Sequence, residues 1–190
     1  MLRLFLAGLA ILFACLNANA QEGGLQPILQ DHQEIIVKSS RKTIKPAIDA
    51  IASSGLPQAQ VMLETWAAKD VWMRKSDGLF FAGKKAEGRS YELTDFDTGA
   101  VVGTYQKSDL KQLKPNSGIR AMIGTALVQF QLTAPDRAKR LAALTSIQRD
   151  PEGALLEPLR ASIEGEPDAD LKAQKQRLER LLTIGYDEDT

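Results

Sequence analysis

The sequence has almost no cysteine or histidine, and this absence excludes whole classes of site. Cys15 is the single cysteine and His32 the single histidine among 190 residues. Zinc sites need several thiolate or imidazole ligands, and a cysteine–histidine dyad needs both residues close together in the fold. We therefore expect His32 to be a surface residue, and we expect no metal site of this kind.

The sequence also lacks an excess of charge of either sign. It contains 24 acidic and 24 basic residues, so no one-signed field is available to attract nucleic acid or an anionic membrane. Its glycines are spread through turns and are not grouped as a phosphate-binding loop. We therefore expect no cofactor and no nucleic-acid partner.

Long apolar runs are absent after the first residues. Residues 1–20 combine Arg3, the apolar run Leu4 to Leu16 and small residues at Ala18 and Ala20. This is the pattern of a secretory signal peptide, with cleavage predicted before Gln21. The apolar run is shorter than the ~20 residues that a membrane-spanning helix needs, which makes an uncleaved anchor the weaker alternative. The pattern predicts an exported, extracytoplasmic protein.

Cys15 lies inside this segment, so the mature chain would have no cysteine and no disulfide. The run Leu12-Phe13-Ala14-Cys15 loosely resembles a bacterial lipobox, although Phe13 is bulky for that motif. Lipidation of Cys15 is therefore a minor alternative to cleavage.

Amphipathic helices are predicted on both sides of a central segment, over residues 21–70 and 107–190. In the first region Ile44, Ala47, Ile48 and Ile51 recur at three- and four-residue spacing, which places them on one helix face. Prolines and capping residues mark the starts of helices. The apolar stripes predict helices near residues 25–37, 44–51, 57–67, 119–130, 136–147, 151–163 and 168–184.

Two of these helical pairs resemble each other. Residues 41–51 superpose on 137–147 with apolar residues in register, and the helices that follow also match. Helix, proline turn and helix at this spacing is typical of a HEAT-like α-solenoid. Chance similarity in an irregular bundle is the alternative, because apolar spacing alone makes many helices superpose. On the repeat interpretation, residues 171–184 begin a third pair that is incomplete.

The central segment, residues 71–106, is predicted to form antiparallel β-hairpins. Asp77-Gly78 separates two runs rich in β-forming residues and fits a type I′ turn, and Asp95 to Gly99 supplies a second turn. The predicted fold class is therefore mainly α: a HEAT-like α-solenoid of antiparallel helix pairs with an inserted antiparallel β-hairpin subdomain.

Asp97-Thr98-Gly99 is the most specific local motif, because aspartic proteases present each of two catalytic carboxylates on such a string. That chemistry needs two such loops, and the sequence has one. Asp95, Asp97 and Gly99 also suggest a calcium loop, but the distal bidentate glutamate of a twelve-residue loop is missing. A solvated hairpin turn is the preferred interpretation, and we assign no catalytic, cofactor-binding or metal-binding residue.

Two surface hypotheses concern the central segment. Trp72, Phe80 and Phe81 form either an exposed recognition patch or a cover for adjacent helices. A basic cluster interleaved with acidic residues forms either a surface for an acidic partner or an ordinary solvated hairpin. Its members are Lys69, Arg74, Lys75, Lys84, Lys85 and Arg89.

Three runs resemble a known family: VWMRKSDGLFF at residues 71–81, YELTDFDTGAVVG at 91–103 and NSGIRAMIGTAL at 116–127. Together with the signal peptide and the helical pairs, they resemble the N-terminal extracytoplasmic region of the UrtB-type permease of urea ABC transporters. In that family the region precedes a membrane domain that carries the transport pathway. No transport-pathway residue can therefore be assigned here, and the sequence is interpreted as a fragment of a longer permease or as a domain that stands alone.

The resemblance implies a non-enzymatic periplasmic domain that contributes to urea uptake through docking or assembly. Its implied partners are the urea-binding protein and the other transporter subunits, with membrane attachment only through a C-terminal permease domain. The alternative is a free periplasmic helical-repeat scaffold with another protein partner. A remote alternative is a secreted aspartic-type hydrolase that uses Asp97.

Overall fold

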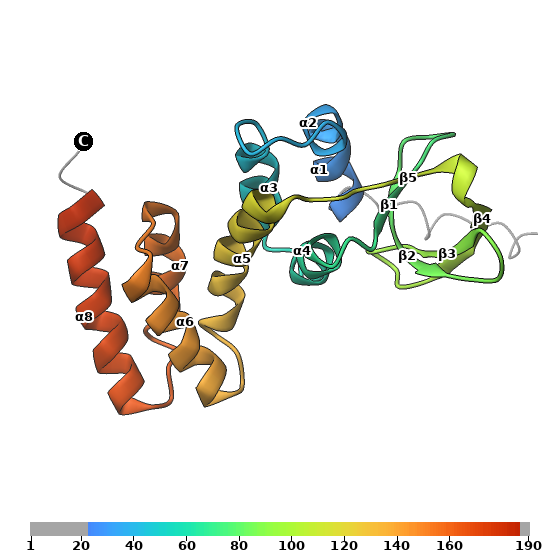
Figure 1. The fold of residues 1–190 in the computed structure, drawn as a ribbon. Coiled ribbons are helices and arrows are strands. Elements are labelled where there is room, and N and C mark those ends of the chain that lie inside the picture. The colour runs from blue at the N-terminus through green and yellow to red at the C-terminus, as the bar shows by residue number, and fades with distance from the viewer. Residues whose placement is uncertain (1–22, 187–190) are drawn as a thin grey trace, which may run out of the picture.

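A five-stranded antiparallel sheet stands at one end of the structure and α-helices make up the rest (Figure 1). The computed structural model describes residues 23–186, in which there are eight α-helices. The predicted signal peptide, residues 1–20 with Cys15, lies outside the described residues. The fold is mixed α/β, and the prediction of a mainly α, HEAT-like solenoid is wrong.

Four short helices precede the sheet. The predicted helix over residues 25–37 breaks at His32 into two, and Gly55 (φ +72°) follows the third helix in the left-handed conformation that glycine allows. Pro46 lies in the first turn of the third helix, where a proline costs no helix hydrogen bond. The four are α1 (Leu25–Asp31), α2 (Gln33–Val37), α3 (Lys45–Ala52) and α4 (Ala59–Ala67).

The sheet has the strand order β4-β3-β2-β1-β5. Both predicted hairpins are present, and β2 also pairs with β3, so that the two hairpins form one continuous sheet. A fifth strand, outside the predicted bounds of 71–106, returns after the 3-10 turn η1 (Lys107–Asp109) to pair with β1. The strands are β1 (Val71–Arg74), β2 (Phe80–Lys85), β3 (Ser90–Thr94), β4 (Val101–Gln106) and β5 (Leu110–Gln112).

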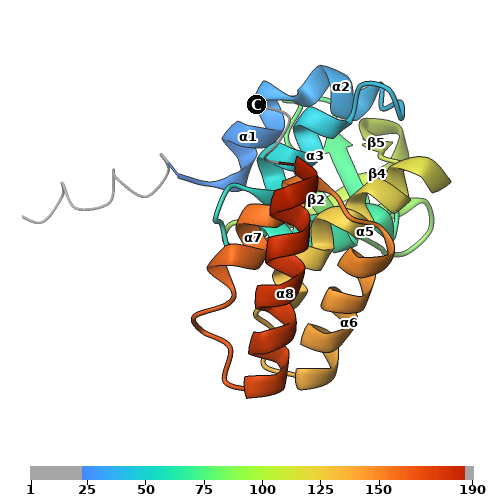
Figure 2. The same cartoon turned by 90° about the vertical axis from the view of Figure 1, so that its left-hand side faces the viewer.

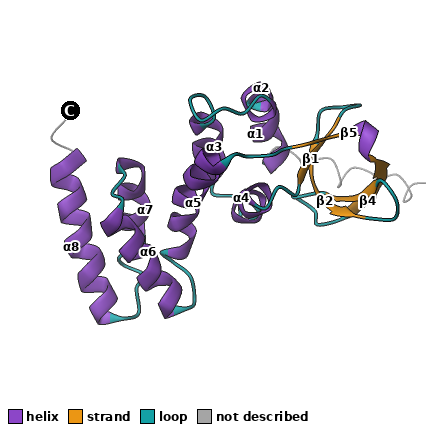
Figure 3. Ribbon diagram, in the orientation of Figure 1, coloured by secondary structure: helices purple, strands orange, loops and turns teal. Residues whose placement is uncertain are grey.

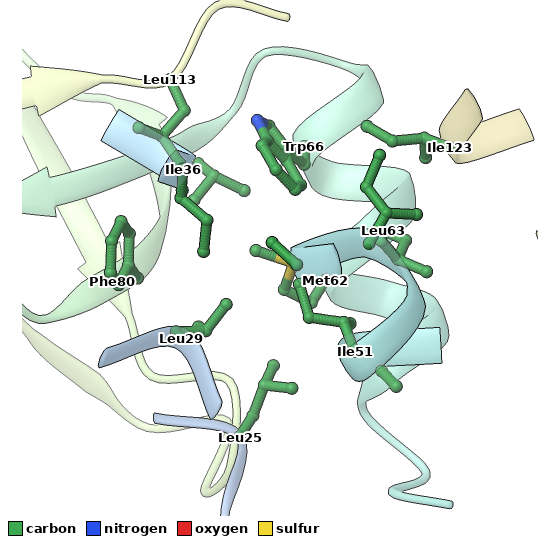
Figure 4. Packing of buried hydrophobic residues seen from close by; sticks show 14 of the residues in the cluster. Leu25, Leu29, Ile36, Ile51, Met62, Leu63, Trp66, Phe80, Leu113 and Ile123 are labelled. Carbon is green, nitrogen blue, oxygen red and sulfur yellow. The ribbon is translucent and has the colours of Figure 1, made fainter. Parts of the chain in front are cut away.

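The two faces of the sheet bury different residues, because successive side chains of a strand point to opposite sides. Val71 and Phe80 belong to the first hydrophobic core. Figure 4 shows Phe80 on the side of the sheet that faces the helices. Trp72, Phe81 and Leu93 lie on the other face, where they are almost fully buried with Leu110. The sheet therefore carries a small core of its own.

Four helices follow the sheet, and side chains cap three of them as the sequence indicates. Asn116 accepts a hydrogen bond from the Ile119 nitrogen, Asp136 from Ala138 and Asp168 from Leu171. The helices are α5 (Ser117–Gln131), α6 (Arg137–Arg149), α7 (Leu156–Ala161), which follows the 3-10 turn η2 (Gly153–Leu155), and α8 (Ala169–Tyr186).

The helices fall into two groups with separate cores, and this arrangement overturns the solenoid. A solenoid stacks successive helix pairs on one continuous core. Here α3 and α4 pack against α1, the sheet and the first half of α5, whereas α6, α7 and α8 pack with one another and with the end of α5 (Figures 2 and 3). Helix α5 joins the groups, with Ile119 and Ile123 in the first core and Val128 and Leu132 in the second.

Candidate functional site

The Asp-Thr-Gly motif lies in the six-residue loop, residues 95–100, between β3 and β4. The Asp95 nitrogen donates to the Ala100 oxygen (2.9 Å), and the Gly99 nitrogen donates to the Asp95 oxygen (2.9 Å). The Oδ1 atom of Asp95 accepts hydrogen bonds from the Thr98 nitrogen and hydroxyl, both at 2.9 Å. Gly99 takes a left-handed φ of +66°, which its lack of a side chain permits. Asp95 and Gly99 therefore build the loop.

Asp97, the residue that a protease would use, binds a helix end. Its Oδ1 atom accepts a hydrogen bond from the Leu25 nitrogen at 2.8 Å and another from the Gln58 side-chain amide. The N-cap position of α1 is Gly24, which has no side chain, so Asp97 caps the helix from 72 residues along the chain. Phe96 beside it packs into the first core. The predicted hairpin turn is present and residues 97–100 are exposed, but the turn also has a role that the sequence did not indicate, because Asp97 caps α1.

In the part of the chain that the structure describes, no second carboxylate is hydrogen-bonded to the carboxylate of Asp97; Asp95 accepts only from the Asp97 backbone nitrogen, at 3.1 Å. An aspartic protease needs two carboxylates that share a proton. Within residues 23–186 no three acidic, histidine or cysteine side chains are placed to hold a metal ion either. What the structure shows of the motif is a link between the sheet and α1.

The turn at Asp77-Gly78, between β1 and β2, also contacts the helices, and it is not the predicted type I′ turn. Only Gly78 has a positive φ (+74°), and the loop closes through the Arg74 nitrogen to the Leu79 oxygen (2.9 Å). The Gly78 oxygen accepts hydrogen bonds from Gln30 (2.9 Å) and Gln33 (3.0 Å). The tip therefore lies on α1 and α2.

Two members of the predicted basic cluster, Arg74 and Lys75, make contacts within the sheet. Arg74 makes an ion pair with Asp77 (2.6 Å) and a hydrogen bond to the Tyr105 hydroxyl (2.6 Å), and its guanidinium lies 4.7 Å from the centre of the Phe81 ring. The hydrogen bond between Arg74 and Asp77 raises the pKa of Arg74 and lowers the pKa of Asp77. Lys75 donates to the Ser108 oxygen at 2.6 Å. Both side chains therefore stabilise the sheet, while Lys75 and the other four lysines and arginines of the cluster are exposed, as expected for a solvated hairpin.

The aromatic recognition patch is also wrong. Trp72, Phe80 and Phe81 are each at most 2% exposed. Phe80 packs against the helices, as the alternative interpretation expects, and the other two fill the opposite face.

A cleft lies between α3, α5 and η2. It has a volume of about 410 Å³, and we call it the α3–α5 cleft. Its floor is apolar and includes Ile48, Met122 and Leu155. Sequence reasoning missed it because its lining comes from three separate segments, whose polar residues look like ordinary solvated helix faces.

Charged side chains surround the mouth of the α3–α5 cleft. Lys45 and Asp49 pair with each other at 2.7 Å, whereas Arg41 and Glu152 make no ion pair within residues 23–186. At the wall, Gln129 donates to the Ala52 oxygen at 2.7 Å and so ties α5 to α3. An apolar floor with an unpaired cation and an unpaired anion at its border suits a protein side chain flanked by charges.

A buried charged cluster lies inside the second group of helices. Arg140 donates to both Glu166 oxygens at 3.0 Å, and Lys175 reaches Glu166 at 2.8 Å. Lys175 also donates to the Leu132 and Ser162 oxygens at 2.8 and 3.0 Å. Burial acts to raise the pKa of Glu166, but the hydrogen bonds from Lys175 and Arg140 outweigh it and hold that pKa below the ordinary value of 4.5.

Every member of this cluster is paired, and the cluster joins four segments of chain. We therefore interpret the cluster as structural: its hydrogen bonds hold together the end of α5, the start of α6, the end of α7, and α8. No sequence signal marked Lys175, which occupies a buried helical position otherwise filled by leucines.

His32 lies half-buried between α1 and α2, with Nδ1 3.0 Å from the Ile28 oxygen. No helix of residues 23–186 combines the length and the apolar character that crossing a bilayer requires.

Comparisons of the chain with protein-family models, curated proteins and solved structures give no match. The resemblance to the urea permease region therefore stays a hypothesis that depends on the three quoted runs.

Proposed function

We propose that this chain is the periplasmic N-terminal domain of a urea ABC transporter permease. It contributes to urea uptake through protein contact and catalyses no reaction. The three runs that resemble the permease family and the export pattern of residues 1–20 support the proposal. The capping role of Asp97 supports it as well, because the one motif that suggests catalysis has a structural task.

The α3–α5 cleft carries the docking part of the proposal. Protein interfaces combine a buried apolar centre with a polar border, and the cleft offers both within one surface. Arg41 is exposed and belongs to its border, so it is suited to an ion pair with a carboxylate of the partner. We propose that the partner is the periplasmic urea-binding protein of the same transporter.

Titration calorimetry of the full chain with that urea-binding protein, with and without urea, tests this proposal. We expect binding of the wild type and, for Arg41→Glu, roughly tenfold or greater weakening because the change replaces an attraction by a repulsion. Arg177→Glu is the matched control, since Arg177 is an exposed arginine of α8 outside the cleft. Absence of any complex at high concentration would contradict the proposed function. Equal weakening of binding by both variants would contradict the proposal that the cleft is the docking surface.

A further inference from the structure

Strand β4 leaves one edge of the sheet open. It is the terminal strand in the order β4-β3-β2-β1-β5, and in the described part of the chain it pairs with β3 alone. Val101 and Val102 are 58% and 38% exposed, and the strand VVGTYQ has neither a charge nor a proline. An edge of this kind presents unpaired backbone groups to any chain that can add a strand.

The opposite edge of the same sheet is protected. Strand β5 has three residues, and the central one is Lys111. Short length and lysine are two of the ways in which proteins prevent pairing at an edge. Strand β4 has one irregularity, a register shift opposite Leu93 and Thr94 at its start, and it pairs regularly with β3 over residues 103–106. This regular part of β4 is therefore the edge available for strand addition.

The hydrogen-bond pattern shows which backbone groups of β4 face outward. The Lys107 nitrogen donates to the Arg89 oxygen at 2.9 Å, so the neighbouring pair Ser90 and Gln106 is not directly hydrogen-bonded. Because hydrogen-bonded and non-bonded pairs alternate, Tyr105 bonds to β3, while Thr104 and Gln106 direct their backbone groups away from the sheet. These two residues offer donors and acceptors to a further strand.

The charges at the two ends of β4 favour a second copy of this chain as the partner. The strand starts after the acidic turn that holds Asp95 and Asp97 and ends at Lys107, which makes no ion pair within the described residues. Antiparallel pairing about Thr104 places the lysine end of each copy beside the acidic turn of the other. Parallel pairing would set like charges together.

We propose that this protein associates with itself by antiparallel pairing of two β4 strands about Thr104, which makes the sheet continuous across both copies. The pairing is independent of the α3–α5 cleft and of the proposed role in urea uptake. It uses the open edge, matches backbone donors to acceptors and brings no like charges together.

Sedimentation velocity of the full chain over a range of concentrations tests the pairing. We expect a monomer–dimer equilibrium in the wild type. Thr104→Lys alone and Thr104→Glu alone place like charges opposite each other and should weaken the dimer roughly tenfold or more, whereas an equimolar mixture of the two variants should restore it. Thr145→Lys, on an exposed face of α6, is the control and should dimerise as the wild type does.

Circular dichroism establishes that each variant is folded, and Val101→Lys replaces Thr104→Lys if the latter does not fold. A wild type that stays monomeric at every concentration would overturn the proposal. So would a dimer that persists in both charged variants, or charged variants that fail to associate when mixed.

Discussion

The Oδ1 atom of Asp97 lies 2.8 Å from the backbone nitrogen of Leu25, so a hairpin turn of the sheet caps the first helix. The contact joins residues 72 positions apart and places the sheet against α1. A second hydrogen bond between side chain and backbone holds the other hairpin on the same helix: the Gln30 side chain donates to the Gly78 oxygen. The two turns that first suggest a site are therefore the points where the sheet is attached to the helices.

Replacing Asp97 with alanine should destabilise the protein by about 1 kcal/mol, because the first turn of α1 loses its cap. Asp97→Asn should retain most of the stability, since asparagine caps helices about as well as aspartate. Urea-induced unfolding, followed by far-ultraviolet circular dichroism, measures both.

Glu87→Ala is the control for this pair, because Glu87 lies exposed in the turn between β2 and β3. Its unfolding midpoint should equal that of the wild type. An Asp97→Ala variant as stable as this control would show that the cap contributes nothing.

Gly83→Ala should destabilise the sheet by about 1–3 kcal/mol, because a methyl group there would overlap the Trp72 ring at Cδ1. Gly124→Ala in α5 is the matched control, since nothing lies within 4 Å of its added carbon. That substitution should stabilise by about 0.5–1 kcal/mol, as expected for glycine to alanine within a helix. Thermal melts followed by tryptophan fluorescence distinguish the two, and equal shifts would contradict the packing of Trp72 on Gly83.

Lys175→Met should cost about 3–5 kcal/mol, because it removes one partner from a buried ionic cluster and leaves two buried carbonyls without donors. Lys172→Met, on the same helix, removes only a partly exposed ion pair with Glu164 and should leave the midpoint unchanged. Denaturant unfolding of the two variants compares them directly. A Lys175→Met protein as stable as the wild type would show that the cluster does not hold the four segments together.

Stability should fall in acid, and Glu166 should account for part of the fall. Its pKa in the folded protein is below the ordinary value of 4.5, so the folded state favours the carboxylate. The stabilisation is complete above pH 4.5 and is lost as the pH decreases through the folded-state pKa. Unfolding midpoints measured from pH 7 to pH 3 should decrease less steeply in Glu166→Gln, and parallel curves would exclude this contribution.

Local patterns in the sequence predicted most elements but not their assembly. Asp136 and Asp168 mark true helix starts, and glycine-containing turns mark both hairpins. Strand β5 was missed because three residues around Lys111 carry no β signal, and its pairing with β1 is a long-range contact. The solenoid was wrong because the spacing of Ile44, Ala47 and Ile51 identifies a buried helix face without identifying what covers it.

The sites depended on long-range contacts in the same way. Nothing near Asp97 in the sequence indicates that Leu25 donates to it, and nothing near Lys175 indicates that Glu166 neutralises it. The α3–α5 cleft likewise brings together Arg41 and Glu152, although all five strands lie between them in the sequence. Such sites exist only after the elements have packed.

Hydrogen–deuterium exchange of the full chain, with and without the periplasmic urea-binding protein, tests the central claim that this protein acts by contact through the α3–α5 cleft. The account predicts that the partner protects residues 41–53, 122–129 and 152–155, while the exposed faces of α6 and α8 exchange as before. Exchange that the partner leaves unchanged everywhere, or protection confined to surfaces outside the cleft, would contradict it.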